Sequence, residues 1–378
     1  MHQSSGPHEY DSLDSPQAFR LLRLHDAPSF DDPIECAIET HELDGESHPC
    51  YTALSYTWGS SSRTEAIHLP ASKAHINVTP ILAQALRYLR RLQSTHPDLK
   101  SNWWWIDMLC INQDSLPERT AQVSLMRTIF QTASLTAVWL GPAEDNSDTL
   151  MFHLTDSTPS DRRVWTSSPE GNSAIKAFQD RPYWRRTWII QEVCVSPNVM
   201  LLCGDKVAPW KAFEAQHKWL RQRSFPESHD VPDLRVLRNK FQRNELHLGF
   251  LVYRAKAAQC ANPRDSVFGL LGLVTGGLGL KVVPNYKLSP CAVFSTAIRV
   301  ARADLEESGL RDALIRGRRK PRGAYGFRKK LLAVMEEIQD HLHEPLSEDD
   351  SIRTDCDGFQ CGMWDLCWRF CGIALQLE

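Results

Sequence analysis

The sequence lacks the motifs of several common enzyme and metal-binding classes. It has no C-x-x-C pair, which argues against a zinc ribbon or a thioredoxin-type redox site. The patterns G-x-x-x-x-G-K-[ST], H-E-x-x-H and G-x-S-x-G are also missing. Neither sign of charge dominates, because 43 lysines and arginines face 46 aspartates and glutamates. The net charge of −3 therefore gives no argument for binding nucleic acid or a membrane.

Long hydrophobic runs are also scarce. The longest uncharged apolar stretch, Val267 to Leu280, contains five glycines and is shorter than the roughly 20 residues that a membrane-spanning helix needs. The first 20 residues have neither a basic start nor an apolar core, so we expect no signal peptide. These absences predict a cytoplasmic protein without a membrane partner.

The sequence has 11 cysteines, an odd number, and most of them lie in apolar runs such as MLLCG. We interpret these as small buried residues that stay reduced. The C-terminal cysteines are irregularly spaced and have no histidine among them, so we expect no metal site. The basic run RGRRKPR (316–322) is interpreted as part of a solvated linker, and nucleic acid is not an expected partner.

The chain is long enough for two domains, and 42% of its residues are hydrophobic. Composition and periodicity predict four regions: a mobile polar tail (1–18), a main domain (19–220), a helical extension (221–305), and a charged linker with a Cys/Trp-rich tail (306–378).

The main domain alternates predicted strands with predicted helices. Strands are expected over 19–24, 34–40, 51–59, 103–107, 135–140 and 199–203, and helices after Thr79-Pro80, from Pro117, up to Val195 and over 209–220. This order predicts an α/β fold, a parallel sheet with crossover helices, followed by a mostly helical C-terminal region. The segment 142–180 is longer than a loop without secondary structure usually is, so we expect it to be functional or to contain short secondary-structure elements of its own.

Seven of the 12 tryptophans lie in three short blocks between residues 51 and 192, at Trp58, Trp103, Trp104, Trp105, Trp139, Trp184 and Trp188. Core packing accounts for most of these rings. It does not account for Asp107, Asn112 and Gln113, which follow the tryptophan-rich strand. Ligands of open α/β sheets bind outside the carboxyl ends of strands, so we expect these three side chains at a binding edge.

Glu192 is the second polar feature, because it lies four positions after Trp188 on the same predicted helix face. A carboxylate on an aromatic, inward face is costly unless it is paired. Two interpretations stay open: a structural ion pair with Arg185 or Arg186, or a pocket carboxylate.

These blocks together resemble the fungal heterokaryon incompatibility (HET) domain. The similar segments, spanning core motifs 51–204, are YTALSYTWG (51–59), WIDMLCINQ (105–113) with Glu118, Arg119 and Gln122, VWLG (138–141), RTWIIQEV (186–193) and Cys203-Gly204. PRDSVFGLLG (263–272) and VPNY (283–286) are similar to segments that commonly follow the domain. The resemblance implies a role in non-self recognition between fungal cells, with programmed cell death as the output.

HET domains in turn resemble TIR domains, some of which cleave NAD with a glutamate in a W-x-x-x-E helix. Trp188-Ile-Ile-Gln-Glu192 has that spacing. The likeness implies a TIR/flavodoxin-like core with Glu192 as the catalytic residue. It also implies a pocket formed by Ser55, Tyr56, Trp58, Asp107, Asn112, Gln113, Trp188 and Gln191. NAD would be the substrate, and no cofactor or metal would be required.

Two functions therefore follow from the sequence. The first is a death effector that hydrolyses NAD or a related nucleotide through Glu192 and is activated by self-association. The second is a non-catalytic signalling module that recruits partners, such as an incompatibility or receptor protein. A degenerate copy without function is a third interpretation.

Overall fold

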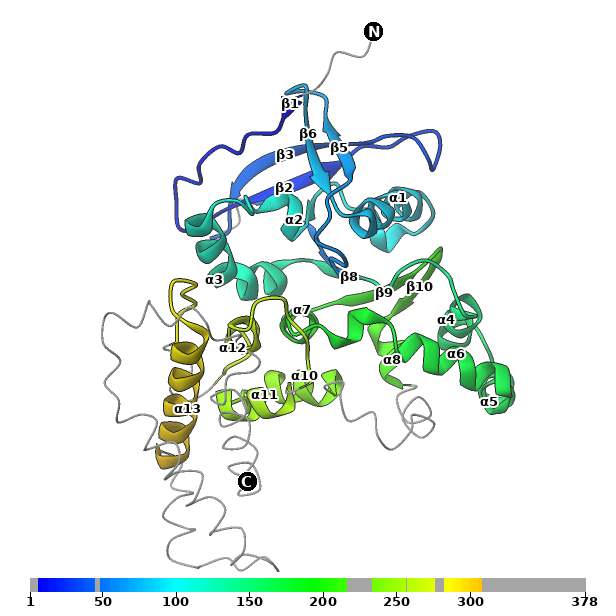
Figure 1. Ribbon diagram of the computed structural model, residues 1–378. Helices are drawn as coiled ribbons and strands as arrows, with labels where there is room; N and C mark the ends of the chain where they lie inside the picture. The colour runs from blue at the N-terminus through cyan, green and yellow to red at the C-terminus, as the bar shows by residue number, and fades with distance from the viewer. Residues whose placement is uncertain (1–5, 45–47, 216–232, 256, 276–281, 308–378) are drawn as a thin grey trace, which may run out of the picture. The chain divides into compact units, whose positions relative to one another are not determined.

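The computed structural model describes residues 6–44, 48–215, 233–255, 257–275 and 282–307 (Figure 1). The chain divides into two compact units: unit 1 comprises residues 1–184 and 196–228, and unit 2 comprises residues 185–195 and 229–378. Residues 185–195 thus group with unit 2, although they precede the predicted domain boundary at residue 220. None of the described helices is both long and apolar enough to cross a membrane.

Unit 1 contains a mostly parallel sheet of ten strands in the order β1-β6-β5-β3-β2-β7-β4-β8-β9-β10. The strands are β1 (Gly6–Pro7), β2 (Ala18–Leu24), β3 (Ile34–Glu42), β4 (Thr52–Ser55), β5 (Glu65–Leu69), β6 (Ala74–Val78), β7 (Trp104–Trp105), β8 (Leu135–Trp139), β9 (Val199–Cys203) and β10 (Lys206–Pro209). With helices on this sheet, the predicted α/β class is confirmed.

The centre of the sheet is a block of four parallel strands, β7-β4-β8-β9. Numbered along the chain, these strands have the order 2-1-3-4, which is the order of flavodoxin-like folds. Strand β4 lies inside this block and all four of its residues are buried. A parallel strand covered on both faces favours apolar residues, which Ala53 and Leu54 supply. The buried hydroxyl of Ser55 is satisfied by the Tyr183 hydroxyl, at 2.7 Å.

The other half of the sheet contains the long antiparallel pair β2–β3 and the hairpin β5–β6. Residues 1–18 were predicted to be a mobile tail, yet Gly6–Pro7 pair in parallel with β6. The Tyr10 hydroxyl also donates a hydrogen bond to the Leu109 carbonyl, at 3.0 Å. Gly6, Pro7 and Tyr10 therefore contact other parts of unit 1.

The helices of unit 1 begin at local sequence signals. They are α1 (Pro80–Thr95), α2 (Asp107–Cys110), α3 (Leu116–Thr132), α4 (Ser147–Thr155), α5 (Pro159–Ser167), α6 (Pro169–Gln179) and α8 (Trp210–Ala215), with short 3-10 helices η1 (Pro97–Leu99) and η2 (Pro182–Arg185). The Thr79 hydroxyl caps α1 by accepting from the Leu82 amide, and the Ser115 hydroxyl caps α3 in the same way. Both helices also carry a proline in the first turn, as predicted.

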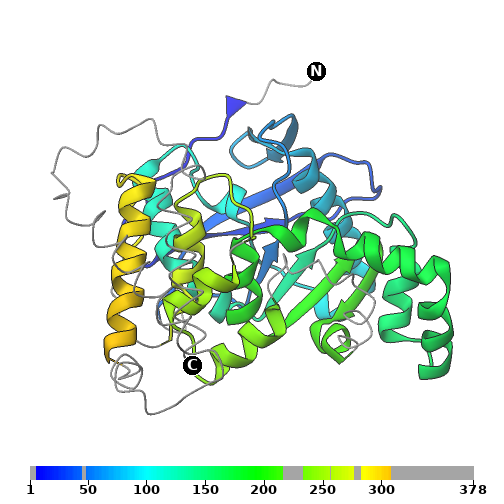
Figure 2. The same ribbon diagram turned by 60° about the horizontal axis from the view of Figure 1, so that its bottom comes forward.

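Residues 142–180 carry three helices, so the expectation of small elements within this stretch is confirmed. Helix α4 packs against β9 and β10, and α6 packs against α4 and α5. Figures 1 and 2 both show the three helices together beside the β10 edge of the sheet.

The described elements of unit 2 are all helices: α7 (Trp188–Val195), α10 (Leu234–Gln242), α11 (Leu248–Arg254), α12 (Asp265–Leu271) and α13 (Pro290–Glu307). Helices α10 and α12 both pack against α7, and α11 packs against α12 and α13. The predicted helical character of this region is therefore confirmed over its described residues. The basic run, the acidic run and the Cys/Trp-rich tail after residue 307 lie outside the described residues.

Candidate functional site

The carboxyl ends of β4 and β8 meet at the point where the strand order reverses, which is where open α/β sheets bind ligands. Ser55 is the last residue of β4, and its hydroxyl lies 2.7 Å from the hydroxyl of Tyr183. Both side chains are almost fully buried. Ser55 and the buried Tyr56 were among the predicted site residues, whereas Tyr183 was not. Tyr183 lies directly before Trp184, and this position in a tryptophan-rich segment was the sequence signal that could have identified it.

Trp58 and Asp107 form the second pair at this edge. The Trp58 indole donates to one carboxylate oxygen of Asp107 at 2.7 Å, and the Met108 amide donates to the other at 2.7 Å. The Gln113 side chain donates to the Asp107 carbonyl at 2.8 Å. Trp58 and Gln113 therefore both contact Asp107, and Asp107 begins α2 instead of ending a strand. Its carboxylate holds the Trp58 ring and the start of α2.

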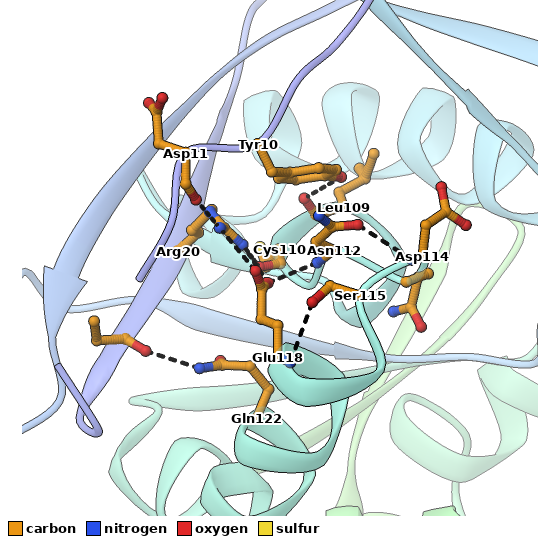
Figure 3. Close-up of polar contacts among 12 residues, drawn as sticks. Tyr10, Asp11, Arg20, Leu109, Cys110, Asn112, Asp114, Ser115, Glu118 and Gln122 are labelled. Carbon is orange, nitrogen blue, oxygen red and sulfur yellow. Dashed lines mark hydrogen bonds and ion pairs between the residues drawn. The ribbon is translucent and has the colours of Figure 1, made fainter. Parts of the chain in front are cut away.

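The backbone of Asn112 joins a different cluster, centred on the ion pair of Arg20 and Glu118 (Figure 3). Glu118 accepts from the Asn112 backbone N–H at 2.8 Å and from the Arg20 guanidinium at 2.6 Å. Arg20 is 3% exposed, and it also donates to the carbonyls of Cys110 and Asp11. The cluster thus fixes the loop between α2 and α3 to strand β2.

The ring of Tyr10 lies against the same guanidinium, with the Arg20 Cζ atom 4.8 Å from the ring centroid. Burial is the main cause that raises the pKa of Tyr10 far above its usual value, so its hydroxyl is a neutral donor to the Leu109 carbonyl. Gln122 donates to the Ala18 carbonyl from the next turn of α3. The family-like residues Glu118 and Gln122 therefore organise the fold around the predicted loop, a role that sequence spacing did not indicate.

Trp188, Gln191 and Glu192 lie on α7 in unit 2. Gln191 and Glu192 are 2% and 3% exposed, respectively. The Trp188 indole donates to the Asp265 carboxylate at 3.2 Å, and the Gln191 side chain accepts from the Gly272 amide at 3.1 Å. Asp265 and Gly272 belong to the PRDSVFGLLG segment, and its sequence did not predict these contacts.

The nine predicted site residues thus fall into separate groups. Ser55, Tyr56, Trp58, Asp107, Asn112 and Gln113 belong to unit 1, whereas Trp188, Gln191 and Glu192 belong to unit 2. A single pocket formed by both groups stays a prediction, as does the pairing of Glu192 with Arg185 or Arg186.

Seven cysteines lie in the described residues, all as free thiols, and Cys36, Cys110, Cys194 and Cys203 are buried. Burial raises the pKa of the Cys110 and Cys194 thiols to about 12, so these side chains are neutral and unreactive. Among the residues that the structure describes, no three His, Cys, Asp or Glu side chains group closely enough to hold a metal ion.

Comparison with known proteins identifies two similarities. Residues 51–192 match the family model of the heterokaryon incompatibility protein (HET). The chain is also 29% identical, over 351 aligned residues, to heterokaryon incompatibility protein 6, OR allele, of Neurospora crassa. That alignment covers 74% of this chain and 51% of the relative, so the chain spans about half the length of the curated relative it matches. No solved structure matches.

Proposed function

Because residues 51–192 match the family model of the heterokaryon incompatibility protein (HET), we propose that this chain is an effector of fungal non-self recognition whose output is programmed cell death. We further propose that it acts by hydrolysing NAD or a related nucleotide, with Glu192 as the catalytic residue. Self-association of the chain in the cytoplasm is the proposed trigger, either alone or through a partner incompatibility protein.

The observation that carries this proposal is the environment of Glu192. Glu192 is 3% exposed, and its neighbours Ile189, Ile190 and Val193 on the same helix are fully buried. A buried carboxylate interacts strongly with positive charge that develops beside it, because little water screens the interaction. The polar contacts of Trp188 and Gln191 hold the same helix, so the carboxylate is held in place before any substrate binds.

This chemistry suits cleavage of the bond between nicotinamide and ribose. The C1′–N bond breaks, the electron pair leaves with neutral nicotinamide, and positive charge builds on the ribose ring. The Glu192 carboxylate stabilises that charge. Water then adds to C1′ and loses a proton, giving ADP-ribose. One carboxylate is sufficient for this reaction, and no redox step takes place.

The test is nicotinamide release from NAD by the purified full chain, over a range of protein concentrations that allows self-association. Glu192→Gln is the informative variant, because it keeps the shape of the side chain and removes its charge. Glu245→Gln is the matched control, since Glu245 is an exposed carboxylate in the same unit. We expect release by the wild type and the control, and a loss of about 100-fold or more in Glu192→Gln.

A second function is favoured by a different observation. Phe152 on α4 and Val164 on α5 are large apolar side chains that are 46% and 73% exposed. A contiguous apolar patch marks a surface that binds other proteins, so these two residues are the ones that a non-catalytic module would use to recruit a partner. In that case Glu192→Gln leaves cell death unchanged, whereas Phe152→Ser with Val164→Ser abolishes it.

A further inference from the structure

Asp265 joins two side chains of unit 2 that are far apart in sequence. One carboxylate oxygen accepts from the Trp188 indole at 3.2 Å, and the other accepts from the Tyr286 hydroxyl at 2.7 Å. An indole has a single N–H donor, so its acceptor sets how the ring is held. Asp265 therefore ties the first residue of α7 to α12 and to the segment that follows it.

Two further contacts place α7 against the same segment. The Gly272 amide donates to the Gln191 side chain at 3.1 Å, one turn further along α7 than Trp188. The backbone of Gly269 approaches α7 so closely that a Cβ atom there would lie 3.1 Å from Thr187 Cγ2 and 3.4 Å from Trp188 Cδ2. The start of α7 is thus held by the Asp265 carboxylate, by the Gly272 backbone N–H and by close packing against the backbone of Gly269.

From these contacts we propose that Asp265 is a positioning residue for α7, the helix that bears Glu192, and that the functional unit of this chain extends past residue 192 to at least Tyr286. The catalytic part of this inference rests on the proposed function of Glu192. The placement of α7 rests on the contacts alone, so the two parts can be tested separately.

Two substitutions at Asp265 separate hydrogen bonding from other roles of the side chain. Asp265→Ala removes both acceptors. Asp265→Asn keeps an oxygen for the Trp188 indole, and its amide can donate to the Tyr286 hydroxyl, which is able to accept. We therefore expect alanine to release α7 and asparagine to retain it. Glu245→Gln again serves as the control, because it removes an exposed carboxylate in the same unit.

The first measurement is hydrogen exchange of the full chain, followed by mass spectrometry of peptides that cover residues 188–195. We expect the α7 amides to exchange about tenfold faster or more in Asp265→Ala, while peptides covering β4 and β8 keep wild-type rates. Asp265→Asn and Glu245→Gln should match the wild type. Unchanged α7 exchange in Asp265→Ala, or an equal acceleration throughout the chain, would overturn the positioning role.

The second measurement is nicotinamide release, with cell death on induced expression in a filamentous fungus as its cellular counterpart. We expect Asp265→Ala to lower kcat with little change in KM, and Asp265→Asn to restore it. If Glu192→Gln is inactive and Asp265→Ala fully active, the positioning role fails while the proposed function stands. If Glu192→Gln and the wild type behave alike, the catalytic proposal fails, and the exchange result alone decides the placement of α7.

Discussion

Removal of the Glu118 carboxylate tests the buried cluster that fixes the loop between α2 and α3. In Glu118→Ala, Arg20 loses its charge partner while it remains 3% exposed, and the backbone N–H of Asn112 loses its acceptor. Breaking a buried ion pair by removing one partner costs about 3–5 kcal/mol. The 12% exposure of the Glu118 side chain gives the remaining guanidinium little access to water. We therefore expect a loss in that range for unit 1.

The assay is urea unfolding of the full chain, followed by tryptophan fluorescence. With an m-value of about 1–3 kcal/mol per molar urea, the expected loss lowers the unfolding midpoint by at least about 1 M. Glu39→Ala is the matched control on the same sheet. Glu39 pairs with Arg23 at 3.8 Å with both side chains 51% exposed, and such surface pairs contribute about 1 kcal/mol or less.

The double variant Arg20→Met with Glu118→Leu separates the ion pair from the space that it fills. Replacing both charges with apolar side chains of similar volume removes the uncompensated charge, so part of the loss in Glu118→Ala should be recovered. Equal midpoints for Glu118→Ala and Glu39→Ala would refute the reasoning, because they would mean that burial adds nothing to this pair.

Two smaller changes test other contacts. Gly269→Ala should lower the thermal unfolding midpoint. Alanine improves helix propensity by about 1 kcal/mol, but its Cβ would lie 3.1 Å from Cγ2 of the buried Thr187. A higher midpoint would show that α7 can move aside. His153→Phe should flatten the pH dependence of stability. Burial and then Arg162 lower the pKa of His153 below 6.5, so below that pH the unfolded chain binds a proton that the folded chain does not. The wild type should therefore lose more stability than His153→Phe between about pH 6.5 and 5 in urea unfolding, and parallel losses would contradict this explanation.

Elements with local signals could be predicted from the sequence. Helix α1 was predicted from the Thr79 hydroxyl followed by Pro80, and its cap forms as expected. Helix α3 was predicted from Pro117, and the Ser115 hydroxyl, which had not been predicted as a cap, caps it. Strand β4 was predicted because its apolar residues end near Gly59, whose φ of +68° suits a glycine turn. The hairpin of β5 and β6 was missed, since its turn contains Lys73 at positive φ and no Asn-Gly or Asp-Gly signal.

Contacts between distant residues could not be predicted, because no local pattern encodes them. Ser55 and Tyr183 are 128 positions apart, and Arg20 and Glu118 are 98 apart. The sequence placed Asn112 beside Asp107 by proximity along the chain. The structure connects the backbone N–H of Asn112 to Glu118, because the turn into α3 brings its capped first turn back toward the loop.

The boundary of the family match also shows that a local sequence pattern leaves out distant residues that contact α7. The match ends at residue 192, within α7. The side chains that hold α7 lie at Asp265 and Gly272, beyond that boundary and in the same compact unit. A fragment cut after the family match would keep Glu192 and lose the acceptor of Trp188. Activity absent from such a fragment would therefore say nothing against the catalytic role of Glu192, and only the longer chain can test it.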